Sequence, residues 1–199
     1  MSMAWKPPTL TGRRSTDISG LLFLSIVAIA VFSALWEKRS RDAHDSTLIP
    51  GEPLPVYDAF SHDGSVVSME MFRGRVVLLT FWTRQCTACV DQFESMQALG
   101  DDLGDDGLEV VSVNLEETDR VLVRSYLDAL GYDWANLFDD PSHVNEVFAW
   151  GKLIPKTILL NRDGTVGVWW RGKVDLASAE NRAIIHEAMS IPGAPGPGG

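Results

Sequence analysis

The chain has 199 residues, a formal net charge of −10 at pH 7, 45% hydrophobic residues and two cysteines. This length allows one ordinary domain plus a small extra segment, and the hydrophobic share is large enough for a core. The acidic balance, without a basic stripe, argues against nucleic acid as a partner, and two cysteines are too few for a disulfide-stabilised scaffold.

The N-terminal region predicts a membrane anchor. After a tail over residues 1–17, residues 18–36 form a stretch without a charge. Its length is about what a helix needs to cross a hydrocarbon layer of ~30 Å, and Trp36 at its end suits the membrane interface. A cleaved signal peptide is the alternative, because Ala28-Ile29-Ala30 resembles a cleavage site, but cutting there would leave an apolar terminus at Val31.

Charge does not decide how this segment is oriented. The positive-inside count is tied, because three basic residues precede the segment and three follow it (Lys6, Arg13 and Arg14; Lys38, Arg39 and Arg41). Arg13-Arg14 also resembles a twin-arginine signal, although polar Ser15-Thr16-Asp17 follow where apolar residues are expected. We favour an uncleaved anchor.

A polar linker and a hairpin come next. Residues 37–52 are polar and broken near their end by proline and glycine, which predicts a linker before a folded domain over residues 53–191. The domain opens with two short apolar runs, residues 54–60 and 66–69, joined by an Asp63-Gly64 turn. This combination predicts a β-hairpin.

Residues 76–82 read VVLLTFW and predict the central strand. Because this run does not alternate, we expect both of its faces to be covered. A helix is predicted over residues 87–99, with Val90, Phe93 and Met96 spaced for the core.

The rest of the domain alternates strands with helices. We expect strands over residues 108–114, 136–138, 156–161 and 165–171 and helices over residues 119–130 (capped by Thr118), 141–150 (capped by Asp140) and 175–191. Trp169 and Trp170, as neighbours on a strand, should face opposite sides of the sheet. Residues 100–107 contain four aspartates but lack the ligand order of an EF-hand, which favours a solvated loop ending the preceding helix. The tail over residues 192–199 should be disordered.

This order of elements predicts an α/β fold, with a central mixed sheet flanked by helices on both faces. The two cysteines, in Cys86-Thr87-Ala88-Cys89, lie just beyond the predicted central strand, where open α/β sheets place their chemistry. No internal repeat is present.

This C-x-x-C motif is the strongest chemical signal in the chain. The start of a helix offers unpaired N–H groups and a partial positive charge, which stabilise a thiolate on Cys86. Cys89 lies three residues on, on the same helical face, and can form or resolve a disulfide. A zinc half-site or an inert buried pair is the alternative. A zinc site would need two histidines with ligand-like spacing, which His44, His62, His143 and His186 lack.

Together these features resemble the thioredoxin fold. Residues 76–82 followed by the two cysteines look like its active-site entry, and Gly151-Lys152-Leu153-Ile154-Pro155-Lys156-Thr157 is similar to its cis-proline loop. The long insert between them, the N-terminal hairpin and the membrane segment resemble the TlpA/ResA/CcmG group of anchored thiol-disulfide oxidoreductases. The likeness covers residues 51–191.

The resemblance implies a thioredoxin-like fold preceded by one transmembrane helix, with Cys86 as nucleophile and Cys89 as resolving cysteine. It also implies that Pro155 is cis and that the backbone of Ile154 pairs with the substrate. Without the family, a trans proline that starts an edge strand is equally open. No cofactor and no metal are expected, and the residues expected to line the site are Trp82, Gln85, Thr87, Ala88 and Gln92.

Three positions depart from the family pattern. Gln85 stands where tryptophan is common, Thr80 where classical thioredoxins carry a buried acid, and Gln92 where ResA-like proteins have a functional glutamate. These changes remove proton acceptors for Cys89 or means of shifting its pKa. Asp91 and Glu94 lie nearby, but their helical directions do not aim at the sulfurs. The redox direction is therefore left open.

The resemblance implies protein substrates, such as apocytochrome c cysteines or copper-site thiols, and an electron donor or acceptor in the membrane. It places the domain on the periplasmic side of the cytoplasmic membrane. A peroxiredoxin-type peroxidase is one alternative, because Thr83-Arg84-Gln85-Cys86 supplies T-x-x-C, although Leu79 stands where that family has proline. A copper chaperone that uses both cysteines and His143 is another.

Overall fold

The computed structural model describes residues 47–116, 119–149 and 151–192. The predicted membrane segment over residues 18–36, the N-terminal tail and most of the linker lie outside these ranges, as does the C-terminal tail from residue 193. Within the described ranges, no helix is long and apolar enough to cross a membrane.

The described elements alternate between strand and helix as predicted. In chain order they are β1 (Asp58–Phe60), β2 (Val66–Ser68), the 3-10 helix η1 (Met69–Phe72), β3 (Val76–Trp82), α2 (Thr87–Leu103), β4 (Leu108–Asn114), α3 (Arg120–Leu130), β5 (Ala135–Phe138), α4 (Pro141–Phe148), β6 (Lys156–Leu160), β7 (Val166–Arg171) and α5 (Ala179–Ser190). In this part of the chain, seven strands form one mixed sheet in the order β2-β1-β5-β4-β3-β6-β7.

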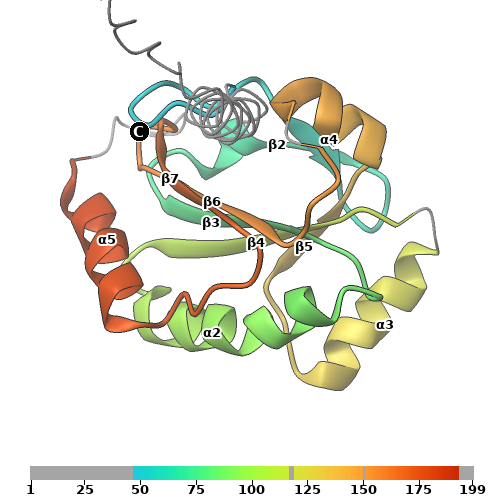
Figure 1. Cartoon of the computed structure of the whole chain (residues 1–199). Coiled ribbons are helices and arrows are strands. Elements are labelled where there is room, and N and C mark those ends of the chain that lie inside the picture. The colour runs from blue at the N-terminus through green and yellow to red at the C-terminus, as the bar shows by residue number, and fades with distance from the viewer. Residues whose placement is uncertain (1–46, 117–118, 150, 193–199) are drawn as a thin grey trace, which may run out of the picture. The chain divides into compact units, whose positions relative to one another are not determined.

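Strand β3 lies inside the sheet, and all seven of its residues are buried. Val76, Leu78 and Trp82 belong to the core cluster shared with α2, α3 and α5. The alternate residues of the strand belong to a second cluster shared with α4. Figure 1 shows α2 and α5 on one side of the sheet and α4 on the other. Coverage on both faces is therefore confirmed.

Strand β3 pairs with β4 on one side and with β6 on the other. It runs parallel to β4, with Trp82 opposite Asn114, and antiparallel to β6, with Phe81 opposite Lys156. Since β3 and β6 run in opposite directions, the end of β3 and the start of β6 meet at one edge of the sheet.

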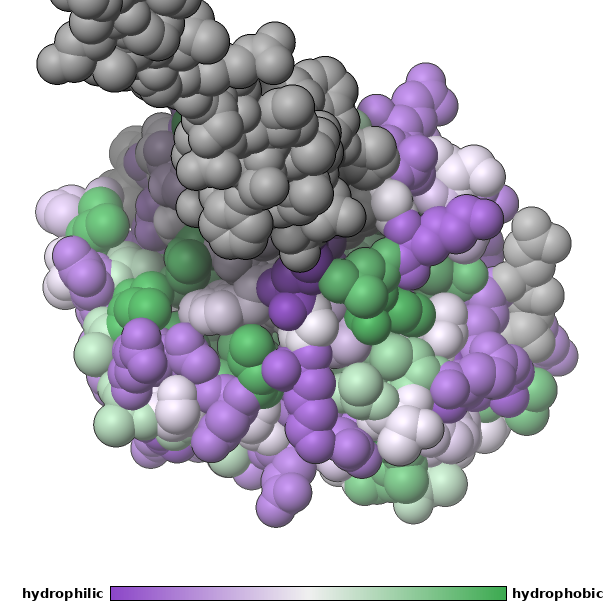
Figure 2. Space-filling view, in the orientation of Figure 1, coloured by the Kyte–Doolittle hydropathy of each residue, from purple (hydrophilic) through white to green (hydrophobic). Residues whose placement is uncertain are grey.

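The adjacent tryptophans of β7 separate as their alternation predicts. Trp170 packs against the α2 side of the core and donates from Nε1 to Oδ1 of Asn181 in α5, over 3.1 Å. Trp169 packs against the other cluster. On the surface in Figure 2, hydrophilic side chains separate smaller hydrophobic groups, in keeping with the acidic composition.

Helix α2 is longer than predicted. The expectation that it ends at Leu99, with an acidic loop over residues 100–107, is wrong by one helical turn. Leu103 is buried in the core and anchors this extra turn. Gly100 lies so close to β4 that an added Cβ would be 3.4 Å from a methyl carbon of Val110.

Three other helix ends also differ from their predictions. Helix α5 begins at Ala179 rather than residue 175, because the side chains of Asp175 and Ser178 each accept a backbone N–H hydrogen bond before and at its start. Asp119, rather than Thr118, caps α3, and Thr118 is outside the described residues. Helix α4 ends at Phe148 instead of residue 150, because Ala149 adopts the left-handed conformation (φ 51°).

Lys156, the first residue of β6, is buried on the α4 side of the sheet, with its Nζ 5.9 Å from the centre of the Trp169 ring. Burial lowers the pKa of its ammonium group from 10.5 to about 7. Between these two pH values the unfolded chain binds more protons than the folded chain. Stability should therefore rise as the pH increases through this window.

We expect Lys156→Met to raise the free energy of unfolding near pH 6 by at least about 1 kcal/mol, because it removes the cost of burying a charge. The gain should shrink near pH 10, where Lys156 is neutral in the folded chain. Urea unfolding of the full chain at both pH values measures the gain. The control is Lys173→Met, since the Lys173–Asp91 ion pair is half-exposed and worth little. An equal gain at both pH values would contradict the explanation.

Candidate active site

The site begins where β3 passes into α2. The backbone N–H of Cys86 donates to the carbonyl oxygen of Thr83 over 3.2 Å, which closes the turn after the strand. Cys86 then occupies the N-cap of α2, and its Sγ accepts the backbone N–H of Cys89, also over 3.2 Å. The first turn of α2 carries no acidic residue. A thiolate on Cys86 would therefore be stabilised by the helix N-terminus.

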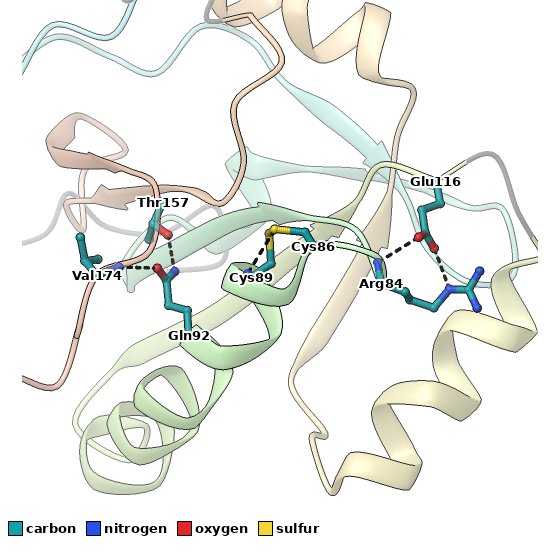
Figure 3. Close-up of a disulfide and its surroundings, with 7 residues drawn as sticks. All are labelled: Arg84, Cys86, Cys89, Gln92, Glu116, Thr157 and Val174. Carbon is teal, nitrogen blue, oxygen red and sulfur yellow. Dashed lines mark hydrogen bonds and ion pairs between the residues drawn. A yellow bond between two sulfur atoms is a disulfide. The ribbon is translucent and has the colours of Figure 1, made fainter.

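The two cysteines form a disulfide, with 5.2 Å between their Cα atoms (Figure 3). Cys89 is fully buried in the core, whereas Cys86 is partly exposed. A sulfur atom arriving from outside can thus reach Cys86 and not Cys89.

The proline loop lies at the same edge of the sheet. The Ile154–Pro155 peptide bond is cis, as the family resemblance implies. The pairing of Lys156 with Phe81 places Pro155 beside the end of β3, and Ile154 packs against the same core cluster as Cys86. Strand β6 lies between β3 and β7. The alternative of a trans proline at an edge strand is therefore wrong.

A neutral hydrogen-bond network lies behind the disulfide. Gln92, Thr157 and Thr80 are all buried. Gln92 donates from Nε2 to Oγ1 of Thr157 over 2.9 Å and accepts the N–H of Val174 over 3.0 Å, and the hydroxyls of Thr157 and Thr80 are 2.9 Å apart. Among the described residues, no carboxylate takes part in this network.

Gln92 therefore supports the site from behind instead of lining its surface. The nearby acids point elsewhere, as expected. Asp91 is ion-paired with Lys173 over 2.9 Å, and Glu94 is exposed.

The other expected lining residues divide into two groups. Trp82 is buried, donates from Nε1 to Oδ1 of Asn136 over 3.1 Å and packs edge-on against Phe93. It belongs to the same buried core cluster as Cys89 and does not reach the surface. Gln85 and Thr87 are exposed and Ala88 is partly exposed, so these three lie on the surface around the disulfide.

Sequence reasoning missed an ion pair on the other side of the disulfide. The backbone N–H and Nε of Arg84 donate to the two carboxylate oxygens of Glu116, over 2.9 and 2.7 Å, and only 8% of the Glu116 side chain is exposed. Figure 3 shows this pair and the Gln92 network on opposite sides of the disulfide. Each residue lies two positions beyond the paired ends of β3 and β4. Once β3 and β4 are known to be parallel neighbours, this equal offset predicts that Arg84 and Glu116 lie close together.

His143, the candidate metal ligand, is hydrogen-bonded through Nδ1 to Asp139 and stacked on Tyr57. The described ranges contain no group of three or more His, Cys, Asp or Glu side chains arranged to hold a metal ion.

Comparison with known proteins agrees with this geometry. The chain is 23% identical over 181 residues to the thiol-disulfide oxidoreductase ResA of Bacillus subtilis, which covers 90% of this chain and 93% of that protein. The ResA of Halalkalibacterium halodurans is 27% identical over 147 residues, covering 73% and 81%. A solved Chlorobium tepidum structure, described as a thiol:disulfide interchange protein DsbE, has a TM-score of 0.64 at 24% identity and covers 72% of this chain and 99% of its own. This likeness shows that the fold is thioredoxin-like.

The model of the AhpC/TSA family matches residues 50–168. The matched region runs from before β1 into β7 and contains both cysteines and Pro155. The chain therefore belongs to the AhpC/TSA family.

Proposed function

We propose that the protein is a thiol-disulfide oxidoreductase that acts on cysteine-containing polypeptides. The observation that carries this proposal is the disulfide at the start of α2, with Cys86 accessible and Cys89 buried. The names of the ResA relatives support it. An inert structural pair would have no need for one sulfur at the surface on a helix N-terminus.

The reduced site would act in two steps. The Cys86 thiolate attacks one sulfur of a substrate disulfide; a new S–S bond forms, the substrate S–S bond breaks, and the other substrate sulfur leaves as a thiolate that takes up a proton. Cys89 then loses its proton and attacks Sγ of Cys86, which releases the second substrate thiol. Two electrons have passed to the substrate, and the Cys86–Cys89 disulfide remains. Run in reverse, the same steps oxidise a substrate dithiol.

The two cysteines have different surroundings, which suit Cys86 to act as the nucleophile and Cys89 to act as the resolving cysteine. The helix N-terminus stabilises the thiolate of Cys86, both as nucleophile and as leaving group. The network of Gln92, Thr157 and Thr80 offers no carboxylate behind Cys89. The proton of Cys89 therefore passes to water or to the departing substrate thiolate. Ile154 would pair with the substrate backbone beside Pro155, as the family resemblance implies.

We further propose that residues 18–36 tether the domain to the outer face of the cytoplasmic membrane. The length and apolar character of this segment support the tether. Disulfide exchange with protein substrates fits an oxidising compartment. Apocytochrome c cysteines or copper-site thiols are the substrates that the family resemblance implies, with a membrane protein as electron donor or acceptor.

We expect Cys86→Ser to abolish the reduction of insulin disulfides, because Cys89 is buried and cannot make the first attack. Cys89→Ser should still attack but should accumulate a mixed disulfide with substrate, visible on non-reducing gels and released by dithiothreitol. Peroxide consumption by the wild type, measured in parallel, tests the peroxidase alternative. Unchanged insulin reduction by Cys86→Ser would refute the proposed function.

The Gln92 network predicts a pH-dependent effect of Gln92→Glu. Burial should raise the pKa of the new carboxyl above its usual value of about 4.3. The carboxyl then favours the folded chain most below about pH 4.3, where it is protonated in both the folded and the unfolded chain. This stability is lost as the pH rises through the raised pKa. Compared with the wild type, the oxidised variant should lose about 1–3 kcal/mol of stability between pH 5 and pH 8, as measured by urea unfolding. Gln85→Glu, at an exposed position, is the matched control. A loss that is the same at both pH values would contradict the prediction.

The tether predicts that the full chain stays with membranes after an alkaline carbonate wash, whereas a chain lacking residues 1–36 is released.

The proposed orientation predicts that protease added to intact spheroplasts digests the domain, because the domain faces outward. Digestion only after lysis would place the domain on the inner side and contradict the proposed location.

A further inference from the structure

A cavity of about 610 Å³ is lined by α4, the loop before Pro155 and the turn that leads to Cys86. Two of its lining residues, Thr83 and Ile154, are next to the active-site residues. Thr83 accepts the backbone N–H of Cys86, and Ile154 precedes the cis proline. The opposite wall is the first part of α4, which includes Ser142 and Val144.

The lining combines an apolar interior with polar residues that face solvent. Leu115, Val144 and Ile154 supply apolar side chains, and Ser142 and Lys152 are exposed. The volume is within the range of about 300–1,000 Å³ that is typical of ligand sites. A large apolar side chain would bury its surface here without leaving a charge unpaired.

The walls of this cavity are held together by hydrogen bonds. The Oδ1 of Asn145 accepts the N–H of Gly151 over 2.8 Å, and its carbonyl oxygen accepts the N–H of Ala149 over 2.8 Å. The first bond joins α4 to the loop that leads to Ile154, and the second closes the C-terminal end of α4. The wall made by α4 and this loop is thus ordered by its own hydrogen bonds, which reduces the entropy lost on binding.

The geometry of an extended substrate indicates which side chain would enter. When a polypeptide presents its cysteine to Cys86, the residues two positions away face the protein on the same side. They lie about 6.5–7 Å along the strand from the cysteine. A substrate segment paired with Ile154 would run past the cavity, because Ile154 is part of its wall.

We infer that this cavity is a specificity subsite, which accepts a large apolar side chain two residues from the reacting cysteine of the substrate. The inference rests on the proposed function. It assigns substrate selection to α4 and to the loop before Pro155, whereas the cysteines themselves act on any accessible disulfide.

The test uses peptides whose single cysteine is activated as a mixed disulfide with thionitrobenzoate. Attack by reduced Cys86 on the peptide sulfur forms the enzyme–peptide disulfide and releases the coloured thionitrobenzoate anion, the better leaving group. The peptides carry alanine, leucine, phenylalanine or aspartate two positions before or two positions after the cysteine. For the wild-type full chain, we expect leucine or phenylalanine at one of these positions to react about tenfold faster than alanine.

Ser142→Trp should fill the mouth of the cavity and remove this preference, so that the ratio of phenylalanine to alanine rates falls toward one. Because the readout is a ratio within each variant, a general loss of activity does not imitate it. The matched control is Ser125→Trp, at an exposed position of α3, which should keep the wild-type ratio. Circular dichroism checks that both variants fold.

Each outcome decides a different point. Equal wild-type rates for all peptides would overturn the subsite and leave the proposed function intact. A preference that survives Ser142→Trp, or that is lost in Ser125→Trp, would also overturn it. If the reduced wild type reacts with neither the peptides nor 5,5′-dithiobis(2-nitrobenzoate), the proposed function fails as well.

Discussion

The antiparallel pairing of β3 with β6 is the constraint on which the site depends. It joins Phe81 to Lys156, so the chain that leaves β3 toward Cys86 and the chain that enters β6 from Pro155 meet at one edge of the sheet. The burial of β3 on both faces fixes this register, because a slip of one residue would exchange the side chains that face α2 with those that face α4. This pairing therefore brings the cysteines and the proline loop to one surface, although more than sixty positions separate them in the chain.

The disulfide is supported differently on its two sides. Behind Cys89, the network of Gln92, Thr157 and Thr80 is buried, neutral and hydrogen-bonded. Each such bond adds only about 1 kcal/mol net, but leaving one buried partner unpaired costs about 1–3 kcal/mol. On the side of Cys86, Arg84 and Glu116 join the turn to the end of β4. The position of the disulfide is thus held by groups that need not touch the substrate.

Local sequence patterns predicted strands β3 and β4 to the residue, because runs rich in valine and leucine and bounded by turn residues are typical of buried strands. They also predicted the capped start of α4 at Asp140-Pro141. They failed at the ends of α2 and α4, at the start of α5 and at the cap of α3. Gly100 signalled a helix end by its own preference, yet the burial of Leu103 outweighs the cost of a helical glycine, which is about 1 kcal/mol. Tertiary burial decided that boundary.

The sequence by itself determined the reacting pair, since the only two cysteines stand three positions apart at a strand-to-helix junction. It also indicated, through the family resemblance, that Pro155 belongs with them. Only the tertiary structure decided that Cys86 is accessible and Cys89 buried, that Gln92 lies in a hydrogen-bond network, and that Arg84 meets Glu116. The physical reason is that burial and pairing depend on residues distant in the chain, and the register of the sheet brings those residues together.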